Sequence, residues 1–173
     1  DLILTSSTPS MQAVANANRD GRTKHVFGIV ADPFSAGVGL DRANPLHHPA
    51  HMVGQGSFLP VDEAFALAKK ALPSLKTVGI AWNPAESNSE AFTRKARETC
   101  QRMGLTLLEA NVENTSAVME AVQSLASRGA QALFVGGDNT MMSAMGSVID
   151  AARKARIGVF TIVPGAAERG TLI

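Results

Sequence analysis

Short apolar runs alternate with helical patterns along most of the chain, and this alternation restricts the possible folds more than any other feature. Seven runs read as strands because they are apolar at consecutive positions, as parallel strands covered on both faces are. They are Leu2–Leu4, Val26–Val30, Met52–Gly54, Val78–Trp82, Leu105–Ala110, Ala132–Val135 and Val159–Val163.

The segments between these runs carry the start and stop signals of amphipathic helices. Thr8, with proline at the next position, is expected to cap the first helix. Ser87 with Glu90 three positions later predicts a capping box at the start of another helix. Further helices are expected after Asn114 and after Asp138, and the latter presents methionines on a face that we read as core.

The order of these elements predicts an α/β fold with a doubly wound parallel sheet, since the chain from Val78 onward reads βαβαβαβ. The stretch Asp32–His51 interrupts the pattern, because it holds three prolines and three histidines without periodicity. We therefore expect an incomplete first lobe and crossover over residues 1–58, and a second lobe over residues 59–173. Both ends fall in apolar runs, so a truncated piece of a longer protein is expected.

Composition and the missing motifs exclude several classes of function. The 16 basic and 15 acidic residues leave a formal net charge of +1, so nucleic acid is not an expected partner. The sequence contains no run of about 18 apolar residues, which is the length that a helix needs to cross a membrane. Without a nucleophile elbow or a phosphate-binding glycine loop, the chain is expected to be no enzyme and to hold no nucleotide cofactor.

The remaining residues that could bind a metal or react are few. The only cysteine, Cys100, lies on the apolar stripe of its helix, so we expect an inert thiol and no disulfide. His47, His48 and His51 lie in a proline-flanked loop without acidic or cysteine ligands at suitable spacing. The expectation is therefore no metal and a solvated loop.

Polar residues follow the carboxyl ends of several predicted strands, where ligands bind in open α/β sheets. Ser6, Ser7 and Thr8 follow the first strand and offer hydroxyls and free backbone amides to a carboxylate. An N-cap with a turn explains the same residues. Asp32 follows the second strand and either adds a carboxylate to a cleft or only begins a turn.

A second polar cluster follows Trp82. Its amides and hydroxyls can bind a zwitterion by hydrogen bonds, and its carboxylate could hold an ammonium group. A turn with a capping box would also account for the cluster. The polar members are Asn83, Glu86, Ser87, Asn88 and Ser89. The Trp82 indole is expected either in the core or in the wall of a ligand pocket.

The third cluster consists of Gly136, Gly137, Asp138, Asn139 and Thr140. The glycines allow a close approach of backbone or ligand, and Asp138 could neutralise an amine. A helix N-cap is the alternative role for Asp138. A carboxylate at this place would repel a phosphate, so a phosphate ligand is not expected.

Taken in order, these strings resemble the solute-binding proteins of ABC importers, and in particular the tryptophan- and other aromatic-amino-acid-binding proteins of the type I periplasmic-binding fold. The resemblance runs over nearly the whole chain. It rests on Asp1–Gln12, Ala31–Pro33, Ala36–Val38, Leu75–Ile80, Asn83–Ser89, Asp138–Thr140 and Arg169–Gly170.

The resemblance implies two Rossmann-like lobes that close on a small solute, expected to be an amino acid or a related zwitterion, and deliver it to a membrane permease. It implies a periplasmic or extracytoplasmic location and a chain that lacks the first strands of lobe one and the final return segment. The first wall would consist of Ser6, Ser7, Thr8 and Asp32, and the second of Asn83, Glu86, Asn88, Ser89, Asp138 and Asn139. The hydroxyl turn would hold a carboxylate, and Asp138 would pair with an α-amino group.

Two other functions stay open from the sequence. The effector-sensing domain of a transcriptional regulator can share this architecture, and it would need a helix-turn-helix upstream. A flavodoxin-like or other small α/β enzyme could be built on the second lobe alone, although the phosphate loop is missing. A signal peptide or a basic headpiece ahead of Asp1 would separate import from regulation.

Overall fold

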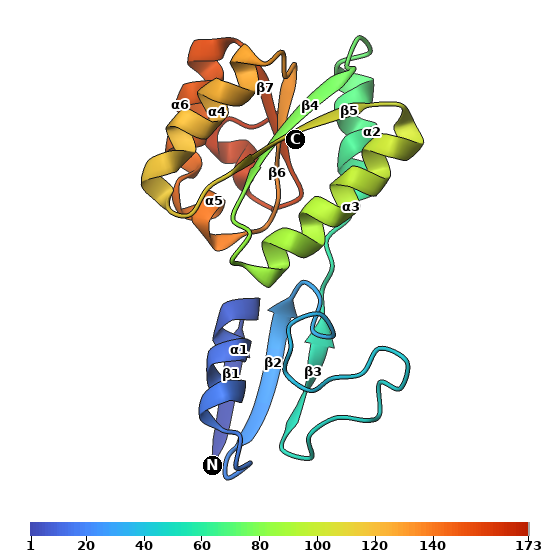
Figure 1. Cartoon of the computed structure of the whole chain (residues 1–173), viewed down its shortest axis with the longest axis vertical. Helices are drawn as coiled ribbons and strands as arrows, with labels where there is room; N and C mark the ends of the chain where they lie inside the picture. Colours follow the sequence, from blue (N-terminus) through green and yellow to red (C-terminus); the bar gives the residue numbers. More distant parts are fainter. Residues whose placement is uncertain (173) are drawn as a thin grey trace. The chain divides into compact units, whose positions relative to one another are not determined.

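A three-stranded parallel sheet with one helix makes up the first of two units in the computed structural model, which describes residues 1–172 (Figure 1). This unit spans Asp1–Phe58. Its strands β1 (Leu2–Ser6), β2 (Lys24–Val30) and β3 (Met52–Gly56) lie in that order, and α1 (Thr8–Ala17) joins β1 to β2. The stretch after β2, from Asp32 to His51, contains neither helix nor strand, as its composition predicted.

The core of unit 1 lies on the face of the sheet that α1 covers. Met11 of α1 packs against Phe27 in a buried cluster. Because side chains alternate between the faces of a strand, Leu4, Val26 and Val53 form a row on the opposite face. Leu4 and Val53 in that row are exposed.

Unit 2 spans Leu59–Ile173 and contains a four-stranded parallel sheet in the order β5-β4-β6-β7. In Figure 1, α2 and α3 lie on one side of its strands, and α4 and α6 lie on the other. The predicted doubly wound α/β arrangement is therefore confirmed. The strands are β4 (Thr77–Trp82), β5 (Thr106–Asn111), β6 (Ala132–Val135) and β7 (Gly158–Thr161). The helices are α2 (Val61–Ala71), α3 (Ser87–Met103), α4 (Val118–Ser127), α5 (Asn139–Ser143) and α6 (Met145–Ala155), with short 3-10 turns at Thr115–Ala117 and Ala166–Arg169.

Two buried layers hold the helices against this sheet. On one face Phe65 of α2 meets Phe134 of β6 and Phe160 of β7, with ring centroids 4.9 to 5.3 Å apart. On the other face Leu125 of α4 and Val148 of α6 belong to one fully buried aliphatic cluster. Burial of such side chains stabilises each by about 1.5–3 kcal/mol, so both faces keep the strands fixed.

The structure corrects several expected helix boundaries. Ser7, and not Thr8, caps α1, with its hydroxyl accepting from the backbone N–H of Ser10 at 3.4 Å. The capping box at Ser87 and Glu90 is wrong, because Glu86 is the N-cap residue of α3 and makes no side-chain bond to that helix.

Other differences concern the extent of elements. The helix expected after Asp138 divides into α5 and α6 at Ala144. The last strand ends at Thr161, two residues earlier than expected. The helix α2 was not predicted, although Phe65 places its apolar stripe in the core.

Candidate functional site

The carboxyl ends of β4 and β6 lie side by side at the point where the strand order of unit 2 reverses. From β4 the chain passes to β5 on one side, and it then returns past β4 to β6 on the other side. Loops at such a reversal diverge and leave room for a ligand. The two turns that begin here, after Trp82 and after Val135, are the ones that carry the second and third polar clusters.

The carboxylate of Glu86 ties these two turns together. Its Oε2 accepts hydrogen bonds from the backbone N–H and the side-chain Nδ2 of Asn139, at 2.7 and 3.1 Å. Its Oε1 accepts from the backbone N–H and Oγ1 of Thr140, at 3.0 and 2.6 Å. Burial alone would raise the pKa of Glu86, but the hydrogen bonds from Thr140 and Asn139 outweigh it, and the pKa lies below its usual value. Glu86 is therefore ionised at neutral pH.

Asn83 and Ser89 complete the link inside the turn after β4. The backbone N–H of Asn83 donates to Oγ of Ser89 at 3.1 Å, and its side-chain amide donates to Oγ1 of Thr140 at 2.9 Å. Asn83 Oδ1 accepts from the backbone N–H of Ala85 at 2.9 Å. Asn83, Ser89 and Asp138 are all buried, so these bonds lie in a medium where losing them is costly.

Asp138 is the most buried acid of the cluster, with 1% of its surface exposed. Its Oδ1 caps α5 by accepting from the backbone N–H of Met141 at 2.8 Å. Burial raises the pKa of Asp138 to about 7, the nearby charge of Glu86 adds to the rise, and hydrogen bonds from Met141 and Ser89 oppose it. Within residues 1–172, no lysine, arginine or histidine forms an ion pair with it.

Asn88 adds an unpaired hydrogen-bond acceptor beside the turn that carries Asp138. Its Nδ2 donates to the backbone carbonyl of Gly137 at 3.1 Å. Its Oδ1 is buried and has no hydrogen-bond partner among the described residues. An acid with no basic partner and an amide oxygen with no donor together suit a ligand group that donates hydrogen bonds and carries positive charge.

The predicted residues of unit 1 lie around the start of α1. Ser6 is exposed, Ser7 is half-buried and Thr8 is buried. Ser7 has a φ of 133°, a backbone conformation that residues other than glycine rarely adopt. Its backbone N–H donates to the carbonyl of Gly28 at 3.2 Å. The N-cap is Ser7 and not Thr8, as the alternative had it, so the Ser7 hydroxyl is already engaged with Ser10.

Asp32 has a role inside unit 1. Its Oδ1 accepts from the backbone N–H groups of Phe34 and Ser35, at 3.2 and 3.4 Å, and Arg42 contacts its Oδ2 at 2.5 Å. The guanidinium of Arg42 also lies 5.1 Å from the centre of the Phe34 ring. The carboxylate thus fixes the first turn of the long excursion after β2, as the turn alternative states.

Sequence reasoning left three residues out of the candidate set. Thr140 accepts from Asn83 and donates to Glu86, so it is the junction of the two turns. Glu109 accepts from Nε1 of Trp82 at 3.0 Å, and Arg97 binds the same carboxylate at 2.8 Å while lying over the indole. Trp82 is therefore packed within unit 2 under Arg97. Thr140 was visible in the sequence as the third letter of the polar string after β6.

The described part of the chain contains neither a metal-binding cluster nor a reactive thiol. No group of three or more His, Cys, Asp or Glu side chains there could hold a metal ion. Burial raises the pKa of Cys100 to about 12, which leaves the thiol protonated and inert. No helix within residues 1–172 is both long enough and apolar enough to span a bilayer.

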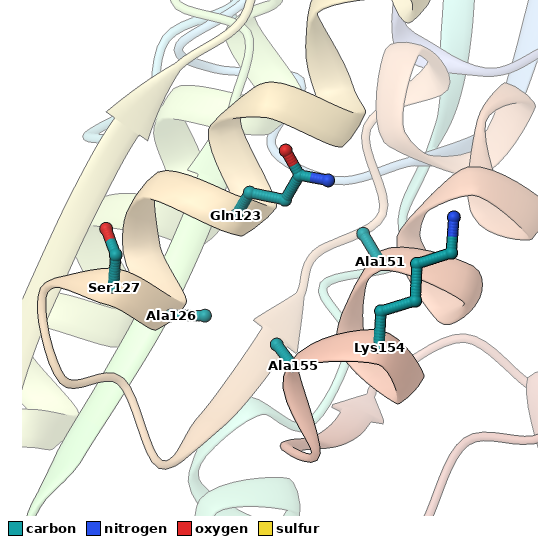
Figure 2. Close-up of a pocket in the computed structure, with 6 residues that line it drawn as sticks. All are labelled: Gln123, Ala126, Ser127, Ala151, Lys154 and Ala155. Atoms are coloured by element: carbon teal, nitrogen blue, oxygen red, sulfur yellow. The ribbon is translucent and has the colours of Figure 1, made fainter.

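Both units also hold cavities away from these clusters. An open groove of about 390 Å³ runs between α4 and α6, and Figure 2 shows Ala126 and Ala155 facing each other across it, with Gln123 and Lys154 beside them. A smaller cavity of about 240 Å³ lies in unit 1 against Phe27 and the excursion after β2. Neither contains a residue of the polar clusters after β4 and β6.

Comparisons with known proteins give a consistent picture. The family described as ABC transporter substrate binding protein matches residues 1–173. A tyrosine-binding protein of Clostridioides difficile (strain R20291) is 28% identical over 172 residues, which are 99% of this chain and 48% of that protein. The chain thus spans about half the length of the curated relative that it matches.

Solved structures with the same fold agree. A conserved domain protein of Vibrio cholerae has a TM-score of 0.90 and 28% identity, and the match covers 99% of this chain and 56% of that one. A Streptococcus pneumonia structure, described as an ABC domain in complex with L-Trp, has a TM-score of 0.89 and 23% identity over the same shares. At that identity the second likeness shows the fold alone.

Proposed function

The chain belongs to the ABC transporter substrate binding protein family, and on that premise we propose that the full-length protein is the solute receptor of an ABC importer. Members of this family bind substrates and act outside the cytoplasm. We extend to this protein an extracytoplasmic location, a membrane permease as partner and the absence of catalysis. The family match favours this function over an effector-sensing domain of a transcriptional regulator.

The proposed solute is an amino acid, and more narrowly an aromatic one. The matching relative at 28% identity points this way, because it is named a tyrosine-binding protein. The observation that carries the proposal is the buried carboxyl of Asp138, which no basic side chain among the described residues pairs, in a turn bound by Asn88, whose buried Oδ1 has no partner there. An α-ammonium group supplies both a positive charge and several donors to such a place.

Unit 1 has the complementary role in this proposal. Ser6 and Thr8 flank the Ser7 cap at the N-terminus of α1, where hydroxyls and backbone N–H groups suit a carboxylate. Asp32 contributes through the turn that it holds with Arg42. We propose that residues 1–58 belong to the first lobe of the receptor and residues 59–173 to the second. Residues of both lobes would then contact the bound solute.

A thermal-shift panel on the full-length protein tests this function. The panel contains the L-amino acids together with tyramine and 3-phenylpropanoate, which keep an aromatic ring but lack the carboxylate and the ammonium group, respectively. We expect L-tyrosine or L-tryptophan to raise the melting temperature and both analogues to fail. Asp138→Asn should weaken binding by about 30-fold or more, since it removes one partner of a buried charge pair. Equal shifts with amino acids and with 3-phenylpropanoate would refute the ammonium site.

A further inference from the structure

The carboxylate of Glu86 has no acceptor site left for a solute, because its partners within unit 2 occupy them. Each carboxylate oxygen accepts two hydrogen bonds, all four from Asn139 and Thr140. A carboxylate offers about four acceptor sites, so the set is full. A solute ammonium could reach Glu86 only by displacing these donors.

The same four bonds restrain the turn that carries Asp138. This turn begins with Gly136 and Gly137, whose backbones are conformationally permissive, and it leads into α5, a helix of only five residues. Asn139 and Thr140 directly follow Asp138, and Glu86 holds the backbone N–H of both. The position of the Asp138 carboxyl is thus fixed by an anchor on the neighbouring strand end.

Resting on the proposed function, we propose that Glu86 is a positioning residue that does not touch the solute but holds Asp138 in place to receive the solute's ammonium group. The alternative is that Glu86 binds the ammonium itself. The two roles can be distinguished by changing the length and the charge of the side chain separately.

The charge of Glu86 affects the pKa of Asp138, so it can be tested through the pH dependence of binding, which hydrogen bonds that only hold the turn in place would not change. Asp138 is faced by Glu86 from the turn after β4, by the Ser89 hydroxyl from α3 and by the Met141 N–H from α5. Removing the Glu86 charge removes one cause of the raised pKa of Asp138, although burial, the largest cause, remains. The carboxyl then ionises at lower pH, and the pH at which ammonium binding reaches half of its maximum moves down with it.

Isothermal titration of L-tyrosine and L-tryptophan into the full-length protein from pH 5 to 9 tests this role. Glu86→Gln should lower the affinity about tenfold at the high-pH plateau and move the pH midpoint down. Glu86→Asp keeps the charge but not the reach, so it should lower the affinity and leave the midpoint in place. Glu98→Gln, on the exposed side of α3, is the matched control and should behave as wild type.

The outcomes separate the possibilities. Wild-type affinity and midpoint in Glu86→Gln would overturn the positioning role, and so would a complete loss of binding in both Glu86 variants at every pH. If no amino acid binds to the wild type, the proposed function itself fails. Should Glu86→Gln not fold, Thr140→Val removes one of the four bonds and must still lower the affinity without moving the midpoint; unchanged affinity would overturn the role.

Discussion

The side-chain amide of Asn83 donates a hydrogen bond of 2.9 Å to Oγ1 of Thr140, and that hydroxyl donates in turn to Glu86 at 2.6 Å. The three residues form a chain from the end of β4 to the end of β6. Because a hydroxyl that both accepts and donates is held at a defined orientation, it links the two turns directly.

Asn83→Ala breaks this chain at its first member. Asn83 is buried, and without it Thr140 loses a donor and Ala85 loses an acceptor in partly buried hydrogen bonds, so the free energy of unfolding should fall by about 1–3 kcal/mol. Denaturant unfolding of the full-length protein measures the change. Glu98→Gln serves as the surface control, and an equal effect from both variants would argue against the chain.

Asp138→Asn should stabilise the protein increasingly as the pH rises. The folded pKa of Asp138 is raised to about 7, above the value of about 4 in the unfolded chain, so between these values the folded state binds more protons. Its contribution to stability is therefore retained below pH 4 and is lost as the pH rises through 7. Asparagine keeps the helix cap and removes the charge, so the gain at pH 8 over pH 4 should be on the order of 2–4 kcal/mol. Melting curves at the two pH values test this, and a pH-independent difference would contradict it.

Arg97→Ala should change the fluorescence of Trp82, which is the only tryptophan of the chain. Arg97 covers the indole at 5.4 Å and holds the Glu109 carboxylate that accepts from Nε1. Its removal exposes the ring to water, so the emission should move to longer wavelength. The free energy of unfolding should fall by about 0.5–1 kcal/mol, because the cation–π contact is lost. Lys154→Ala removes an exposed charge on α6 and should leave the spectrum as it is. An unshifted spectrum in Arg97→Ala would show that other groups cover the indole.

Acid should open the sheet of unit 1. His25 is fully buried on β2, Thr5 occupies its Nε2 at 2.8 Å, and its Nδ1 has no partner among the described residues. Burial and the neighbouring His51 lower its pKa. The unfolded chain then binds more protons than the folded one, so stability is full above about pH 6.5 and falls as the pH drops toward the folded pKa.

Hydrogen exchange of the β2 amides at pH 7.5 and 5.5, corrected for intrinsic rates, measures this loss. Protection should fall at pH 5.5 in the wild type and in His47→Gln, which alters an exposed loop histidine. His25→Gln should remove most of the pH dependence. If its pH dependence equals that of the wild type, another group is responsible.

Strands were predictable from the sequence because burial on both faces of a parallel sheet requires consecutive apolar residues, and each predicted run is a strand. Local caps were only partly predictable. Asp138 caps α5 within its own turn, and that role was anticipated. The capping box at Ser87 failed because the carboxylate of Glu86 is bound to another turn, and Ser87 leaves its hydroxyl buried without a partner among the described residues.

The ties between the turns could not be predicted, because they depend on strand order. Glu86 and Thr140 are 54 positions apart and meet only because β6 pairs with β4. The composition of each turn is visible in the sequence, but the strand that lies next to β4 is fixed only by the pairing in the folded sheet. The raised pKa of Asp138 is likewise a product of burial in the fold.

Proton release on binding is the most direct measurement of whether Asp138 holds the solute's ammonium group. L-Tyrosine and L-tryptophan are titrated calorimetrically into the full-length protein at pH 6, in two buffers of different ionisation enthalpy. We predict binding with release of close to one proton, because Asp138 must ionise to pair with the ammonium, and no such release in Asp138→Asn. Binding without proton release, or unchanged binding in Asp138→Asn, would contradict this role of Asp138.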